Sequence, residues 1–183
     1  MKVLILLIFM SAISVGESRL YNHAFLGDDL VADWPDGLWR LYFERAAVMR
    51  AGHPGANLTT IQKQVTPLLE RFIYRPPGIC PGIFMISAGI RDLSEKSSCG
   101  TITNSIIEVE RLAHSQCPET RVEILSTLFT SETGAFAKAT ARCVNHELQL
   151  YYGSGRLRSG FIHLAIRALD YDDLTRILYR SFL

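Results

Sequence analysis

The stretch CPGIFMISAGIRDLSEKSSCGTITNSIIEVERLAHSQCPETRVEILSTLFTSETGAFAKATARC runs from Cys80 to Cys143 and contains all four cysteines of the 183-residue chain. An even number of cysteines behind a secretion signal indicates a disulfide framework. Between them, apolar residues recur at helical spacing over 81–96, over 102–115, after Pro118 and over 135–152. The stretch therefore predicts successive α-helices tied together by two disulfides.

The rest of the chain shows similar periodicity. One helix is predicted from Trp34-Pro35 to Gly52, and another from a cap at Thr59 or Thr60 to Phe72, with Pro67 expected to kink or divide it. Two short helices are predicted near the end, over 161–169 and 172–182, whereas Gly27-Asp28-Asp29 is interpreted as a turn. No run alternates convincingly, so the predicted fold is all-α, a single-domain, disulfide-stabilised helical bundle of about six to eight short helices.

Four cysteines allow three pairings. Cys99 and Cys117 flank the predicted helix over 102–115, which at 1.5 Å per residue would hold them more than about 20 Å apart. A disulfide needs Cα atoms within about 7 Å, and the same objection applies to Cys80 and Cys99. A hairpin of the two helices instead brings Cys80 next to Cys117. We therefore predict Cys80–Cys117 and Cys99–Cys143, with Cys80–Cys143 and Cys99–Cys117 as the alternative if the helix over 102–115 is broken.

The first sixteen residues resemble a secretion signal. Met1-Lys2 is a short basic start, Val3–Ile13 is apolar, and Ser14-Val15-Gly16 offers small residues for cleavage before Glu17. The apolar run is too short to cross about 30 Å of hydrocarbon, so no stable membrane anchor is expected. We predict a signal peptide over 1–16 and one secreted, extracellular domain over 17–183.

Asn57-Leu58-Thr59 is an N-glycosylation sequon that precedes a predicted helix. In a secreted protein an exposed, turn-like sequon is expected to be used. Asn57 is therefore the predicted glycosylation site, and an unused sequon is the alternative.

The charge balance argues against one class of partner. Lys2 is the only charged residue of the predicted signal, which leaves 18 basic and 18 acidic side chains in the mature chain. A net charge near zero argues against nucleic-acid binding driven by overall charge.

No motif for catalysis or metal binding stands out. The five histidines, which are His23, His53, His114, His146 and His163, form no H-E-x-x-H pair. The cysteines include no close C-x2-C pair, and no serine has a G-x-S-x-G context. We therefore predict no catalytic, cofactor-binding or metal-binding residue and no cofactor, and we expect that the protein is not an enzyme.

Two short stretches resemble stanniocalcins, a family of secreted, disulfide-bonded glycoprotein hormones. Thr133-Gly134-Ala135-Phe136-Ala137-Lys138, followed by Cys143 after four intervening residues, is similar to a G-x-A-F-x-K-x4-C run of that family. Leu169-Asp170-Tyr171-Asp172-Asp173-Leu174-Thr175 is similar to a later acidic segment, with Tyr171 in place of a family cysteine. The resemblance covers under a fifth of the chain and implies a hormone-like signalling role.

The favoured function is that of a secreted helical protein that binds an extracellular protein or receptor, for example as a signalling ligand. The alternative is a carrier for a small hydrophobic ligand, suggested by the large apolar share of the chain. A secreted hydrolase is the third reading. It would require His146 or His163 to meet a carboxylate and a nucleophile in one cleft.

Overall fold

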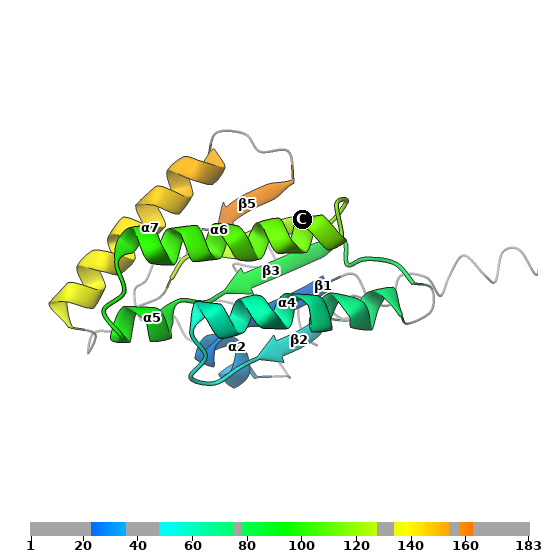
Figure 1. The fold of residues 1–183 in the computed structure, drawn as a ribbon, viewed down its shortest axis with the longest axis horizontal. Coiled ribbons are helices and arrows are strands. Elements are labelled where there is room, and N and C mark those ends of the chain that lie inside the picture. The colour runs from blue at the N-terminus through cyan, green and yellow to red at the C-terminus, as the bar shows by residue number, and fades with distance from the viewer. Residues whose placement is uncertain (1–22, 36–47, 75–77, 128–133, 154–157, 163–183) are drawn as a thin grey trace, which may run out of the picture.

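The computed structural model describes residues 23–35, 48–74, 78–127, 134–153 and 158–162 (Figure 1). These residues form an α/β fold around a five-stranded sheet in the order β2-β1-β3-β4-β5, in which every neighbouring pair is parallel. The strands are β1 (His23–Gly27), β2 (Val48–Gly52), β3 (Ile83–Ser87), β4 (Arg121–Leu125) and β5 (Ser159–Ile162). The prediction of an all-α bundle is therefore wrong.

The central strands β1 and β3 escaped detection because they are buried on both faces. Strands of that kind are continuous apolar runs without alternation, and a short apolar run has no period that separates it from a helix. The predicted helix over 81–96 is in fact β3 followed by the short helix α5 (Ile90–Ser94). In the same way, β4 replaces the helix predicted after Pro118, and β2 replaces the end of the helix predicted up to Gly52. Phe161, predicted in a short helix, lies in β5.

The three long helices lie close to where their periodicity predicts them. They are α4 (Leu58–Ile73), α6 (Cys99–Gln116) and α7 (Ala135–Gly153). Helix α4 is continuous through Pro67, so the proline does not divide it. Its N-cap is Asn57 rather than Thr59 or Thr60, since the Asn57 side chain accepts a hydrogen bond from the Thr60 N–H.

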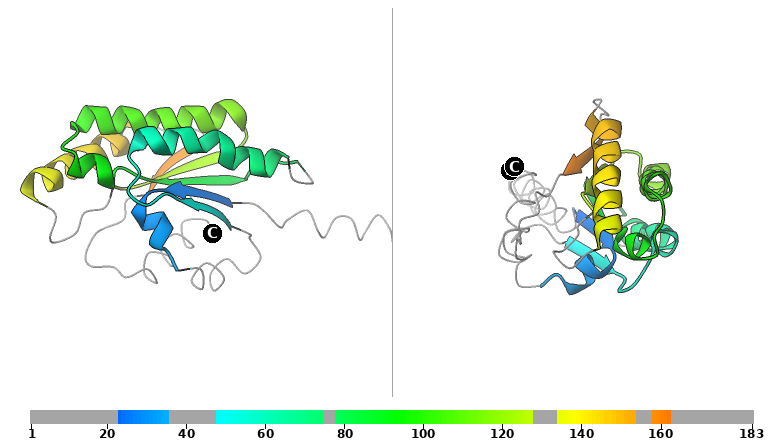
Figure 2. Two further views of the ribbon diagram at one scale, coloured as in Figure 1. Left: turned by 60° about the horizontal axis from the view of Figure 1, so that its bottom comes forward. Right: turned by 90° about the vertical axis from the view of Figure 1, so that its left-hand side faces the viewer.

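The helices form layers on the two faces of the sheet. Figures 1 and 2 show α4, α6 and α7 over one face, and the short helix α2 (Asp29–Asp33) against the other. Under the long helices lies the main core, to which alternate strand residues contribute: Ala24, Leu26, Phe84, Ile86, Val122 and Ile124. On the opposite face the buried Phe25 ring meets the Trp34 ring edge-on, with the ring centroids 5.5 Å apart. This packing holds the strands in register up to their carboxyl ends.

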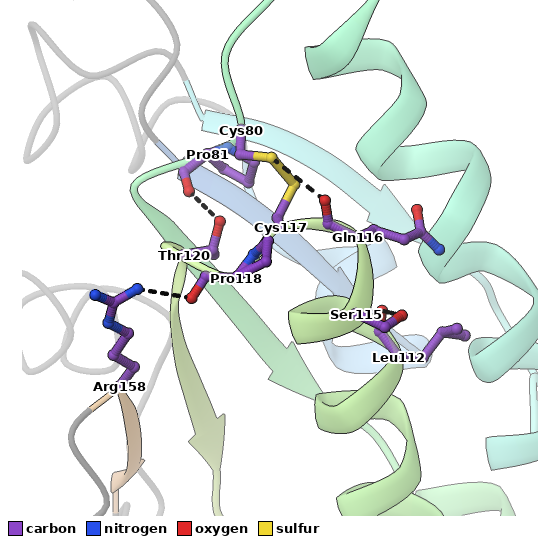
Figure 3. Close-up of a disulfide and its surroundings, with 9 residues drawn as sticks. All are labelled: Cys80, Pro81, Leu112, Ser115, Gln116, Cys117, Pro118, Thr120 and Arg158. Atoms are coloured by element: carbon purple, nitrogen blue, oxygen red, sulfur yellow. Dashed lines mark hydrogen bonds between the residues drawn. A yellow bond between two sulfur atoms is a disulfide. The ribbon is translucent and has the colours of Figure 1, made fainter.

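The structure joins Cys80 to Cys117 and Cys99 to Cys143, with Cα–Cα distances of 5.7 and 5.9 Å. These are the two pairs that helix spacing favoured, but the geometry differs from the predicted helical hairpin. Cys80 precedes β3 and Cys117 precedes β4, so the first bond closes a strand–helix–strand crossover at the amino edge of the sheet (Figure 3). Beside it the Thr120 hydroxyl donates to the Pro81 carbonyl at 2.6 Å. The second bond links the start of α6 to the middle of α7.

Several predicted features lie outside the described residues. They are the signal segment 1–16, His163, the helix over 172–182 and the segment 169–175 that resembles stanniocalcins. Among the helices that the structure does describe, none has the length and apolar character needed to cross a membrane.

Candidate active site

The order in which successive strands are added to the sheet reverses between β1 and β3. The chain passes from β1 to β2 on one side and then crosses to β3 on the other side of β1. In open α/β sheets ligands bind outside the carboxyl ends of the strands at such a switch point. The residues that follow these strand ends are Asp28-Asp29 after β1, His53 after β2 and Ala88-Gly89 after β3. This carboxyl edge is therefore the place to look for a site.

Gly27 brings the ends of β1 and β3 into close contact. A Cβ atom at this position would lie 2.1 Å from the Ser87 carbonyl oxygen and 2.4 Å from a Val31 methyl. The next residue continues the contact, because the Asp28 N–H donates to the Ser87 carbonyl at 3.2 Å. Only glycine allows the ends of β1 and β3 to come this close. Their contact positions the two residues that follow, Asp28 and Asp29.

Asp28 is a fully buried carboxyl group at the switch point. Its Oδ2 accepts a hydrogen bond from the Ile90 N–H at 3.1 Å, and the N–H groups of Leu30 and Gly89 also stabilise its charge. Burial outweighs these bonds and raises the pKa of Asp28 to about 6. Among the residues described, no group donates to Oδ1. Asp28 therefore connects the loops after β1 and β3 from within the protein.

Asp29 is the more open carboxyl group of the pair. It is half-buried, and its Oδ1 accepts a hydrogen bond from the Gly55 N–H at 2.8 Å. Asp92 holds the same β2–α4 loop further along, with Oδ2 accepting from the Leu58 N–H at 2.9 Å. Partial burial raises the pKa of Asp92. Asp29 and Asp92 together fix the β2–α4 loop at the carboxyl edge of the sheet. Asp29 remains within reach of solvent.

His53 follows β2 beside these aspartates. Its backbone N–H donates to the Gly27 carbonyl at 2.9 Å, which extends the strand pairing by one residue. Two causes lower the pKa of His53: burial is the larger, and the positive charge of Arg71 is the smaller. The Nε2 atom is buried and has no hydrogen-bond partner in the part of the chain that is described. His53 is therefore a neutral imidazole at neutral pH.

The loop after β4 is held by a buried amide. Asn145 of α7 accepts from the Thr127 N–H at 2.8 Å and donates to the Thr127 carbonyl at 3.1 Å. Thr127 faces Gly89, whose φ of 111° belongs to the left-handed region that favours glycine. Asn145 thus fixes the strand end next to the switch point.

A second polar cluster lies between α6 and β5. The Ser159 hydroxyl donates to Glu110 Oε1 at 2.6 Å and lies 3.1 Å from His114 Nε2. The same carboxylate oxygen of Glu110 is 3.6 Å from His114 Nε2, so the acid and the hydroxyl lie at the same ring nitrogen. In a nucleophile–base–acid relay the acid instead binds the other ring nitrogen. Ser159 pairs with Val122, toward the amino ends of the strands. The cluster is a contact that holds α6 on β5.

Of the two histidines expected in a hydrolase site, the structure tests only His146, which does not meet the expectation. His146 is exposed on α7, and His163 is outside the described residues. The described residues contain no group of three or more His, Cys, Asp or Glu side chains that could hold a metal ion. The residues missed were Asp28 and Asp29, which were interpreted as a turn. The sequence signal that could have placed them at a strand end is the apolar run Ala24-Phe25-Leu26 directly before Gly27.

No family model matches the chain, and no curated protein sequence matches it. Solved structures do resemble it. A GDSL-like lipase from Bacteroides thetaiotaomicron gives a TM-score of 0.69 at 13% identity, over 90% of this chain and 88% of that one. A member of the lipolytic G-D-S-L family from Veillonella parvula gives 0.61 at 15% identity, over 76% of each chain. A carbohydrate esterase of family 3 from Talaromyces cellulolyticus gives 0.58 at 13% identity, over 79% and 78%.

These likenesses show the fold, and they correct the functional expectations. The protein shares its fold with solved lipases and esterases, and this finding contradicts the expectations of a non-enzymatic protein and of an extracellular binding protein. They lend no support to a ligand carrier. The resemblance to stanniocalcins stays a prediction.

Proposed function

We propose that the protein is a hydrolase of ester bonds whose active site is the carboxyl edge of the sheet around Asp29. The observation that carries this proposal is the position of Gly27-Asp28-Asp29-Leu30 at the switch point of a fold found in lipases and esterases. Hydrolysis of an ester is the reaction common to those enzymes.

The four residues differ from the name of the similar family at one position. That name reads G-D-S-L, and this chain reads G-D-D-L, with Asp29 at the place of the serine letter. A serine hydroxyl attacks an acyl group directly when a base activates it. A carboxylate can act instead as a general base on water. Asp29 is therefore assigned a different chemical role from a serine.

In this mechanism Asp29 takes a proton from a water molecule as the water oxygen attacks the ester carbonyl. The carbon–oxygen bond to the alcohol then breaks, and the proton passes to the departing alkoxide, which leaves an acid and an alcohol. The Gly55 N–H holds Asp29 Oδ1, so Oδ2 is the oxygen left to face the water. The neutral imidazole of His53, at the end of β2 on the same edge, is a second group able to carry a proton.

Hydrolysis of p-nitrophenyl acetate by the purified chain and by Asp29→Asn tests the assignment. The amide oxygen of asparagine can still accept the Gly55 N–H, so the loop is kept while the base is lost. We expect Asp29→Asn to hydrolyse the ester roughly 10²-fold or more slowly than the natural chain, as for removal of a general base. Asp33→Asn is the matched control, because Asp33 is an exposed carboxylate at the far end of α2.

Either of two results would overturn the proposal. If the natural chain hydrolyses no faster than buffer and Asp29→Ser creates activity, the fold lacks a working base at this position. Equal rates for the natural chain and Asp29→Asn would likewise remove Asp29 from the mechanism.

A further inference from the structure

The predicted glycosylation sequon lies directly beside Asp29. Asn57 stands between Gly55, whose N–H binds Asp29, and Leu58, whose N–H binds Asp92. Two peptide units separate Asn57 from Gly55, so their Cα atoms are at most about 7.6 Å apart. Any group attached to Asn57 is therefore attached at the carboxyl edge of the sheet.

The Asn57 side chain is arranged so that its nitrogen remains available. Its Oδ1 accepts from the Thr60 N–H and from the Thr60 hydroxyl, both at 3.1 Å, and so caps α4. Within the described residues Nδ2 makes no hydrogen bond, and Asn57 is only half-buried. A glycan bonds to Nδ2. The helix cap and the modification therefore use different atoms and are compatible.

The third residue of the sequon is also accessible. Thr59 is exposed in the first turn of α4, and its hydroxyl has no part in the cap. Capping of α4 requires Asn57 but not Thr59. The presence of a hydroxyl residue at position 59 is thus not explained by the helix, whereas it is what an N-glycosylation sequon requires.

We propose that Asn57 carries an N-linked glycan that restricts the access of large substrates to Asp29. The restriction rests on the proposed hydrolase function, and the modification rests on the predicted secretion. In the modification a bond forms between Nδ2 and the first sugar carbon of a lipid-diphosphate-linked oligosaccharide. The lipid diphosphate leaves, and the amide nitrogen loses one proton. The large, hydrated sugar is then held beside the carboxylate and excludes bulky substrates more than small ones.

Expression of the full chain in a glycosylating eukaryotic host tests the modification. Three proteins are compared by intact mass before and after treatment with an N-glycosidase: the natural chain, Thr59→Ser and Thr59→Ala. We expect a mass loss for the first two and none for Thr59→Ala, which removes the sequon and keeps the Asn57 cap. A natural chain secreted without a glycan overturns the proposal.

Ester hydrolysis by the same proteins tests the restricted access. On p-nitrophenyl acetate we expect Thr59→Ala to match the natural chain, because the small ester passes the glycan. On p-nitrophenyl palmitate we expect the rate of Thr59→Ala to be several-fold higher. Equal rates on the palmitate ester, with the glycan shown to be present, overturn the role in access.

A second measurement does not depend on activity. Asp29 is labelled with a water-soluble carbodiimide and a bulky amine, and the product is mapped by mass. Glu119, an exposed carboxylate at the opposite edge, serves as the internal reference. We expect Asp29 to be labelled several-fold faster in Thr59→Ala, with Glu119 unchanged, and equal labelling overturns the proposal. If no variant hydrolyses any ester, the proposed function fails, while the mass and labelling data still decide this inference.

Discussion

The buried carboxylate of Asp28 accepts a hydrogen bond at 3.1 Å from the backbone N–H of Ile90, a residue 62 positions away. This contact crosses the point at which β1 and β3 end, next to the half-buried Asp29. A single proton on Asp28 can therefore change the stability of both loops that build the carboxyl edge.

Stability should depend on pH through Asp28. Burial raises its pKa from 3.8 to about 6, so the folded protein binds this proton more tightly than the unfolded chain does. The free energy of unfolding should then fall as pH rises from about 4 to 6, by about 3 kcal/mol for this group, and stay lower above that range. Urea unfolding of the natural chain and of Asp28→Asn at several pH values measures the difference.

The comparison with Asp28→Asn isolates this residue. Burial also raises the pKa of Asp92 and Glu123, and these groups act in the same direction in both proteins. The asparagine oxygen can keep the bond from Ile90 without a charge. If the two proteins lose stability in parallel between pH 4 and 7, Asp28 is not the group responsible.

Gly27→Ala should be strongly destabilising. The added methyl would lie 2.1 Å from the Ser87 carbonyl oxygen, so the ends of β1 and β3 must separate. A cost of about 1–3 kcal/mol is typical of overpacking, and a backbone contact places this change at the upper end. Gly100→Ala in α6 is the control, since outside its own helical turn and chain neighbours nothing lies within 4 Å of the added methyl. It should stabilise by up to about 1 kcal/mol. Thermal or urea unfolding of both variants checks the contrast.

Asn145→Ala should weaken the loop after β4. The substitution leaves the buried N–H and carbonyl of Thr127 without their present partners, at a cost of about 1–3 kcal/mol for each group left unsatisfied. Gln149→Ala, at an exposed position of the same helix, should change stability little. Urea midpoints give the effect. Equal midpoints for the two variants would show that water replaces the amide without cost.

The disulfide at the amino edge should stabilise the domain by reducing the conformational entropy of the unfolded chain. Cys80 and Cys117 are 37 positions apart, and closure of a loop of that size corresponds to about 4 kcal/mol in the chain-entropy description. The double variant Cys80→Ala/Cys117→Ala should lose a stability of this order in urea. Reduction of the natural chain removes both bonds and should cost more. A midpoint unaffected by the double substitution would contradict this estimate.

The long helices could be located from the sequence because their signals are local. Apolar positions repeat along one face of α4, α6 and α7, and each helix is long enough for the repeat to be distinct. The strands could not, because each is four or five residues long. Ile83-Phe84-Met85-Ile86 is apolar on both sides of the sheet, and such a run has no period from which a strand can be identified.

What the sequence determined by itself was the position of the helices, the distance limits on cysteine pairing and the sequon at Asn57. The parallel sheet and its order were decided only by tertiary structure, because strand pairing joins residues that are far apart along the chain. For the same reason only the fold shows that Gly27-Asp28-Asp29 is not a simple turn. Pairing with β2 and β3 brings His53, Gly55 and Ile90 to these two aspartates, and three loops thereby meet at one edge.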